Sequence, residues 1–158
     1  MESAVDIAAY ISFRYKNEYG ANIDEMKLHK LLYFSQRESL IQLGEPLFSE
    51  EFRAWKYGPV LVRVREIIRY CSLVPQTVDY NLPEKYQPIL DKVFSQYAGK
   101  DSWSLSRLSH GEYSWQNARK GLGPIYNCAN AITLEDMKVD ADRIKLRRYF
   151  VSKLDAAN

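Results

Sequence analysis

The amino-acid sequence predicts a mainly α-helical fold: a single compact helical domain of about six to eight helices, with a small two- or three-stranded β element near residues 50–57 and 74–80. Three observations lead to this expectation. Apolar residues recur at helical spacing in several segments, most clearly in residues 27–36. Residues 51–57 alternate as a half-buried strand does. The chain is long enough to bury one core and no linker divides it, so residues 1–158 are expected to form one domain.

The helix expected over residues 27–36 organises the rest. Four of its residues share one face at positions i, i+3, i+4 and i+7, namely Leu28, Leu31, Leu32 and Ser35. Tyr33 and Phe34 extend the apolar surface beyond that face, which predicts a helix covered on more than one side. Asp24 is expected to cap the start of this helix, and Gly44 is expected to end it.

Other helices are expected in order along the chain, over residues 3–18, 60–70, 86–97, 103–109 and 112–120, and from Asp140 or Asp142 to about Leu154. Ser102 is expected to cap the helix at residues 103–109, because its hydroxyl can accept a hydrogen bond from a free backbone N–H. Thr133, followed three residues later by Asp136, has the spacing of a capping box. It is expected to start a short helical segment before the final helix.

The alternating segment is the strongest strand candidate, and it places Trp55 and Tyr57 on one face. A lone strand cannot satisfy its own backbone, so it requires a partner, and residues 74–80 are the expected one. Gly58 and Pro59 are expected to form a rigid turn from the strand into the next helix.

The face that carries Trp55 and Tyr57 allows two interpretations. If it points inward, the two rings anchor the core. If it points outward, they form an aromatic platform for a binding partner. The core interpretation is preferred by a narrow margin, and this stretch of the chain is still the expected centre of function.

Composition excludes several classes of protein. The net charge of +2 provides no global field for capturing nucleic acid. No signal peptide and no apolar run long enough for a membrane span occur, so a cytoplasmic protein is expected. Cys71 and Cys128 are expected to be reduced. The two cysteines and two histidines have no metal-ligand spacing, and neither a metal nor a cofactor is expected.

The sequence offers little support for catalysis. His29 is expected to be a surface or interface residue, because nothing near it in the sequence would orient it as a general base. His110 is expected to fix a helix end beside the core residue Trp115, although its polar neighbours would also suit a site. Cys71 and His110 would suffice for a small hydrolase, but no other feature points to one. We therefore expect a protein that is not an enzyme.

The expected final helix is rich in cations, namely Arg143, Lys145, Arg147, Arg148 and Lys153. The simplest interpretation is a solvated helix face; the alternative is a surface for an acidic partner or for nucleic acid. Four apolar residues are expected to dock this helix on the body, namely Ile144, Phe150, Val151 and Leu154. Arg147 and Tyr149 would also suit a protein interface, where Arg and aromatic residues are enriched.

Three segments follow one another with the residue types and spacing of a known family: KLHKLLYFSQ from Lys27, GEPLFSEEFRAWKYGPV from Gly44, and RLSHGEYSWQ from Arg107. They resemble the Panacea domain, also called the SocA-like antitoxin domain, over roughly residues 5–120. The resemblance implies a mainly helical antitoxin of a bacterial or phage toxin–antitoxin system, including those of prophages. It also implies neutralisation of a partner toxin by direct protein–protein contact.

The implied partner is a cognate toxin encoded by an adjacent gene. Alternatives are a proteolytic adaptor, with a protease as the further partner, and a phage-associated regulatory binding protein; a homodimer is also open. A nucleic-acid-binding module is not favoured, and no membrane partner is expected. Eight residues are candidates for protein binding, namely Trp55, Tyr57, Gly58, Pro59, His110, Trp115, Arg147 and Tyr149.

Overall fold

The computed structural model describes residues 1–70, 80–123 and 126–157. In this part of the chain the fold is mainly α-helical, as predicted, with seven α-helices and one two-stranded antiparallel sheet. The elements in order are α1 (Ala4–Tyr19), α2 (Glu25–Leu43), β1 (Arg53–Trp55), β2 (Gly58–Val60), α3 (Val62–Tyr70), η1 (Glu84–Tyr86), α4 (Gln87–Val93), η2 (Phe94–Ala98), α5 (Ser102–His110), α6 (Tyr113–Ala118) and α7 (Leu134–Ala156).

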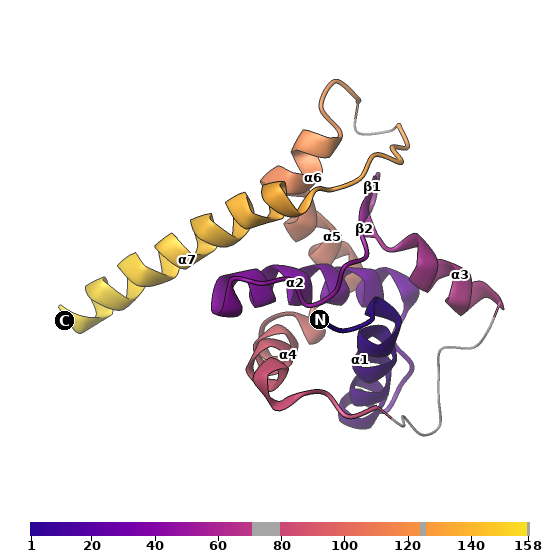
Figure 1. The fold of residues 1–158 in the computed structure, drawn as a ribbon, viewed down its shortest axis with the longest axis horizontal. Helices are drawn as coiled ribbons and strands as arrows, with labels where there is room; N and C mark the ends of the chain where they lie inside the picture. Colours follow the sequence, from indigo (N-terminus) through magenta and orange to yellow (C-terminus); the bar gives the residue numbers. More distant parts are fainter. Residues whose placement is uncertain (71–79, 124–125, 158) are drawn as a thin grey trace.

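Helix α2 forms the centre of the molecule. It is buried continuously from Lys27 to Ile41, because α1, α4, α5, β2 and α7 all pack against it. Figure 1 shows α2 crossing the middle of the fold with the other helices around it. The predicted caps are confirmed: the Asp24 carboxylate accepts a hydrogen bond from the Lys27 N–H at 2.8 Å, and Gly44 has a left-handed φ of 71°. The expectation that α2 is covered on more than one side is therefore correct.

The sheet differs from its prediction. Gly58 and Pro59 are not a turn into a helix; they lie in β2, which pairs antiparallel with β1 in the register Ala54 opposite Pro59. The other edge of β1 is bridged by residues 130–132, through hydrogen bonds at Ala54 and Ile132. Proline fits here because its missing N–H faces away from the ladder at a sheet edge. Most of the expected partner strand at residues 74–80 lies outside the described residues.

Two helix starts are also corrected. The cap of α5 is Asp101, which accepts a hydrogen bond from the Ser104 N–H at 2.9 Å; the Ser102 hydroxyl instead donates to the Asp24 carboxylate and joins the starts of two helices. Thr133 caps α7, whose single run of 23 residues begins at Leu134 and replaces the expected short segment and separate final helix. The helix is continuous because no residue between its two halves breaks the backbone hydrogen-bond pattern of an α-helix.

Only part of α7 packs on the body. Met137, Asp140 and Ala141 are buried against α2 and α6, whereas the C-terminal end of the helix, beyond the contact of Arg148 with Glu38, extends away from the other elements (Figure 1). The expectation that Phe150, Val151 and Leu154 dock on the body is wrong. The helix is simply longer than the surface that it crosses, so these side chains pass beyond it. None of the helices in the described residues combines the length and the apolarity that a membrane crossing requires.

Candidate functional site

A pocket of about 360 Å³ opens beside the β1–β2 hairpin. Its walls come from the first half of α2, from the hairpin and from α3, and include His29, Lys30, Trp55, Tyr57 and Arg65. The turn of the hairpin brings Trp55 and Tyr57 to the mouth of this pocket. Four of the eight residues predicted to bind a protein therefore lie together in this hairpin, namely Trp55, Tyr57, Gly58 and Pro59.

Trp55 and Tyr57 are not core residues. Ala54 occupies the buried side of β1, Trp55 is half-buried, and Tyr57 is 47% exposed. The Arg65 guanidinium lies 4.9 Å above the Trp55 ring, and the ring of Tyr57 makes an edge contact with the exposed Trp103. The preferred core interpretation is therefore wrong, because the inward position on this short strand belongs to Ala54.

The floor of the pocket is formed by two buried polar residues of α2. Lys30 is 1% exposed, and burial lowers its pKa to about 8. His29 is buried too, and its Nδ1 accepts a hydrogen bond from the backbone N–H of Leu61 at 3.2 Å. Burial lowers the pKa of His29, so the ring is neutral near pH 7. His29 was expected to be a surface or interface residue, but it is 2% exposed, because β2 and Leu61 cover this side of α2.

His110 and Trp115 lie behind the hairpin. Their rings stack at 4.1 Å, and the indole N–H of Trp115 donates to the Trp55 carbonyl at 2.9 Å. Burial lowers the pKa of His110. Trp115 thus fixes the hairpin through this hydrogen bond. His110 is the last residue of α5 and lies beside Trp115, which agrees with the simpler interpretation of His110, a residue that fixes a helix end. Cys71, the other half of the suggested hydrolase pair, lies outside the described residues.

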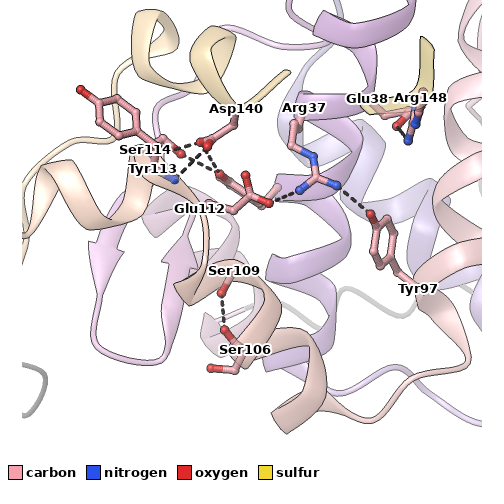
Figure 2. Close-up of polar contacts among 11 residues, drawn as sticks. Arg37, Glu38, Tyr97, Ser106, Ser109, Glu112, Tyr113, Ser114, Asp140 and Arg148 are labelled. Carbon is pink, nitrogen blue, oxygen red and sulfur yellow. Dashed lines mark hydrogen bonds and ion pairs between the residues drawn. The ribbon is translucent and has the colours of Figure 1, made fainter. Parts of the chain in front are cut away.

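A second cluster of polar side chains joins α2 to α6 and α7, and no sequence motif indicates it. Arg37 of α2 donates to the Glu112 carboxylate and, at 2.7 Å, to the Tyr97 hydroxyl (Figure 2). Asp140 of α7 accepts hydrogen bonds from the backbone N–H groups of Tyr113 and Ser114 at 2.8 and 2.9 Å. These partners are 26 to 75 residues apart in sequence, so no local spacing could have indicated them.

The Glu112 carboxyl predicts a pH-dependent stability. Burial raises its pKa to about 7 from 4.5, although the Arg37 guanidinium acts in the opposite direction. Because the folded pKa is the higher one, the folded protein holds this proton between about pH 4.5 and 7, and that contribution to stability is lost as the pH rises through 7. Relative to Glu112→Gln, the wild type should lose about 2–3 kcal/mol of unfolding free energy between about pH 5 and pH 8.

Urea unfolding of both proteins at the two pH values measures this difference, since the other titrating groups are common to both and cancel. Lys85→Gln, a change of one exposed charge, is the control and should show no comparable difference between the two pH values. Parallel stability curves for wild type and Glu112→Gln would contradict the raised pKa.

The second half of α7 carries the two remaining predicted residues, Arg147 and Tyr149, both exposed. Arg148 ties the helix to α2 by two hydrogen bonds to Glu38, at 2.8 and 2.9 Å. Burial opposes ionisation of Glu38, but the bonds from Arg148 and Gln42 hold its pKa below the usual value. Beyond Arg148 the helix makes no further ion pair within the described residues. The eight predicted residues thus fall into two regions. The first is the hairpin together with His110 and Trp115 behind it. The second is the C-terminal half of α7, residues 145–156, here called the free half of α7.

No group of three or more His, Cys, Asp or Glu side chains that could hold a metal ion gathers among the described residues. The buried polar groups of the pocket are the Lys30 cation and the neutral His29 imidazole. Lys56 and Arg65 add positive charge, and the Glu25 carboxylate is paired with Arg65, so the pocket suits an anion rather than a metal. The geometry is therefore that of binding surfaces, with aromatic rings, cations and a pocket beside the hairpin.

Comparison with known proteins assigns the family. Residues 28–116 match the family described as "Antitoxin SocA-like, Panacea domain", and this match covers more than half of the chain. The protein belongs to this family. The matched segment contains most of α2, the hairpin and α3 to α5, whereas α7 lies outside it.

One curated relative is the Antitoxin SocA of Caulobacter vibrioides (strain NA1000 / CB15N), which is 47% identical over 38 residues. That alignment covers 24% of this chain and 20% of the relative, so the chain spans about a fifth of the curated protein that it matches. No solved structure matches the chain.

Proposed function

We propose that this protein is an antitoxin that neutralises a partner toxin by direct contact, and that the free half of α7 is part of the contact surface. Membership in the SocA-like antitoxin family supports the antitoxin role. The single observation that favours direct contact is an apolar stripe along α7 that nothing covers within the described residues.

The stripe consists of residues at helical spacing, namely Val139, Leu146, Phe150 and Leu154. Steps of four and seven residues place them on one face, opposite the buried Met137. Leu154 is 67% exposed, and Leu146 and Phe150 are nearly as open. An uncovered apolar stripe on a projecting helix is typical of a surface that binds another protein.

The charges beside the stripe indicate what kind of protein fits. Between residues 142 and 155, five cations accompany only two carboxylates. Arg148 is engaged by Glu38, but Arg147 forms no ion pair among the described residues. The best complement is therefore an apolar groove with an acidic rim, and we propose that the toxin presents one.

The test is co-expression in a bacterial host with the protein encoded by the adjacent gene. Growth should be inhibited by that protein alone, rescued when this chain is added, and the two should copurify. The double variant Leu146→Ser/Phe150→Ser should lose at least about 100-fold in affinity, because aromatic and aliphatic anchors dominate such interfaces. Leu43→Ser, a change of an exposed leucine on α2, should leave the affinity unchanged.

Arg147→Glu is the matching charge variant, with the exposed Arg63→Glu on α3 as its control. It should slow association, and the effect should shrink at high salt. Undiminished binding by both α7 variants would overturn the proposed surface. Growth rescue without a complex would overturn direct neutralisation and indicate delivery to a protease. A wild-type dimer that the α7 variants dissociate would show that a second copy occupies the stripe instead.

A further inference from the structure

The ammonium group of Lys30 is buried without an anion. Its only hydrogen bond within the described residues goes to the Pro59 carbonyl, at 3.3 Å, and no carboxylate there comes within ion-pair distance. An ammonium group has three donors, so two remain open. Lys27, one helical turn earlier on α2, is satisfied by the Ala98 carbonyl and the Tyr15 hydroxyl. An unpaired buried cation is rare, because desolvation makes it costly unless something binds to it.

His29 presents a second open donor to the same pocket. Because its Nδ1 accepts the Leu61 N–H, its proton lies on Nε2. This Nε2 is buried and has no hydrogen-bond partner among the described residues; Glu25 Oε1 lies 3.5 Å away and is bound by Arg65 at 2.8 Å. Within the described residues, Lys30 and His29, neighbours on α2, thus supply one cation with two open donors and one neutral donor without a hydrogen-bond partner.

The walls of the pocket add an apolar surface and further positive charge. Met26, Trp55 and Val60 provide the apolar side. The one carboxylate of the lining, Glu25, is neutralised by Arg65, whereas Lys56 lies 4.9 Å over the Tyr57 ring without an ion pair in the described part of the chain. The pocket therefore combines an excess of positive charge with aromatic walls.

We propose that this pocket binds a carboxylate that is carried on an apolar stem, in the form of a peptide's acidic side chain or C-terminus. The carboxylate takes the open donors of Lys30 and His29, and the stem lies against Trp55 and Val60. The volume of about 360 Å³ holds one such residue. This site is separate from the α7 stripe and does not depend on the identity of a toxin.

The experiment is an NMR titration of the purified chain with three probes. N-acetyl-L-phenylalanine has the carboxylate and the stem, its amide has only the stem, and inorganic phosphate has only the negative charge. The carboxylate probe should shift the Leu61 amide and the Trp55 indole resonances, and it should bind at least about tenfold tighter than either of the others, because charge-assisted hydrogen bonds decide the difference.

Lys30→Met removes the cation at similar volume and should abolish binding of N-acetyl-L-phenylalanine. The variant should remain folded and melt at a higher temperature, because it no longer buries an unpaired charge. Lys27→Met, the other buried lysine of α2, is the control and should keep the binding.

Each remaining outcome overturns part or all of the proposal. Equal binding of the amide would remove the role of the anion, and equal binding of phosphate would reduce the pocket to a site for small free anions. Unchanged Leu61 and Trp55 resonances with all three probes, or full binding by Lys30→Met, would overturn the site. None of these results depends on the antitoxin proposal, which is tested with a different surface and partner.

Discussion

Replacing Asp140 by Ala is expected to lower the free energy of unfolding by about 3–5 kcal/mol. Asp140 is 3% exposed, and its carboxylate binds the first two backbone N–H groups of α6. The N-cap residue of α6, Glu112, makes no side-chain cap of its own. Asp140 therefore caps α6 from a different helix. Its loss leaves one buried and one partly buried donor unpaired, at about 1–3 kcal/mol for each, and weakens the docking of α7.

Chemical unfolding followed by circular dichroism measures this change. Asp140→Asn keeps one acceptor oxygen and should show a smaller loss than Asp140→Ala. Asp142→Ala, two residues further along the same helix and exposed, should change the stability by no more than about 0.5 kcal/mol. A loss below about 1 kcal/mol for Asp140→Ala would show that α6 and α7 are held together mainly by their apolar contacts.

Features that depend on neighbouring residues could be predicted from the sequence. Asp24 and Gly44 bound α2 where expected, because a cap needs only one side chain or one left-handed residue beside the helix. The apolar spacing of α2 showed equally that several elements would cover it. The local secondary structure, and the mainly helical fold class that follows from it, could therefore be predicted from the sequence.

The burial of the polar residues of α2 could not be predicted from neighbouring residues in this way. On a helix that is packed on one side, His29, Lys30 and Arg37 would face water. Here β2 covers the first two, and the partner of Arg37, Glu112, lies 75 residues away. Glu38 similarly meets Arg148 across 110 residues. Pairs at such separations depend on the tertiary arrangement alone, so no local sequence pattern predicts them.

In α7 the difference is the reverse, because apolar residues that were expected to be buried are exposed. Its apolar residues were expected to face the body, because exposed leucine and phenylalanine are costly unless something covers them. The structure places Phe150 and Leu154 beyond the end of the body, so the same physical argument now points to a partner rather than to the core. The periodicity was interpreted correctly, but the length of the surface under the helix is not encoded in α7 itself.

Gly58→Ala is the second change with a large expected effect, a loss of about 2–4 kcal/mol in unfolding free energy. Gly58 has a φ of 115°, which is strained for any residue with a Cβ. An added Cβ would also lie 2.6 Å from the Ser109 Oγ and overlap the Lys30 side chain. Gly58 is needed because the hairpin passes directly over the buried lysine.

Gly44→Ala separates the two causes, because Gly44 also has a positive φ but no atom lies within 4 Å of its added Cβ. It should cost only about 1 kcal/mol, the backbone part of the effect. Combining Gly58→Ala with Lys30→Ala should restore part of the loss, because the overlap with the lysine is gone. If Gly58→Ala cost no more than Gly44→Ala, the hairpin would not hold Lys30 in place. The two open donors of the pocket would then have no fixed geometry with which to select a carboxylate.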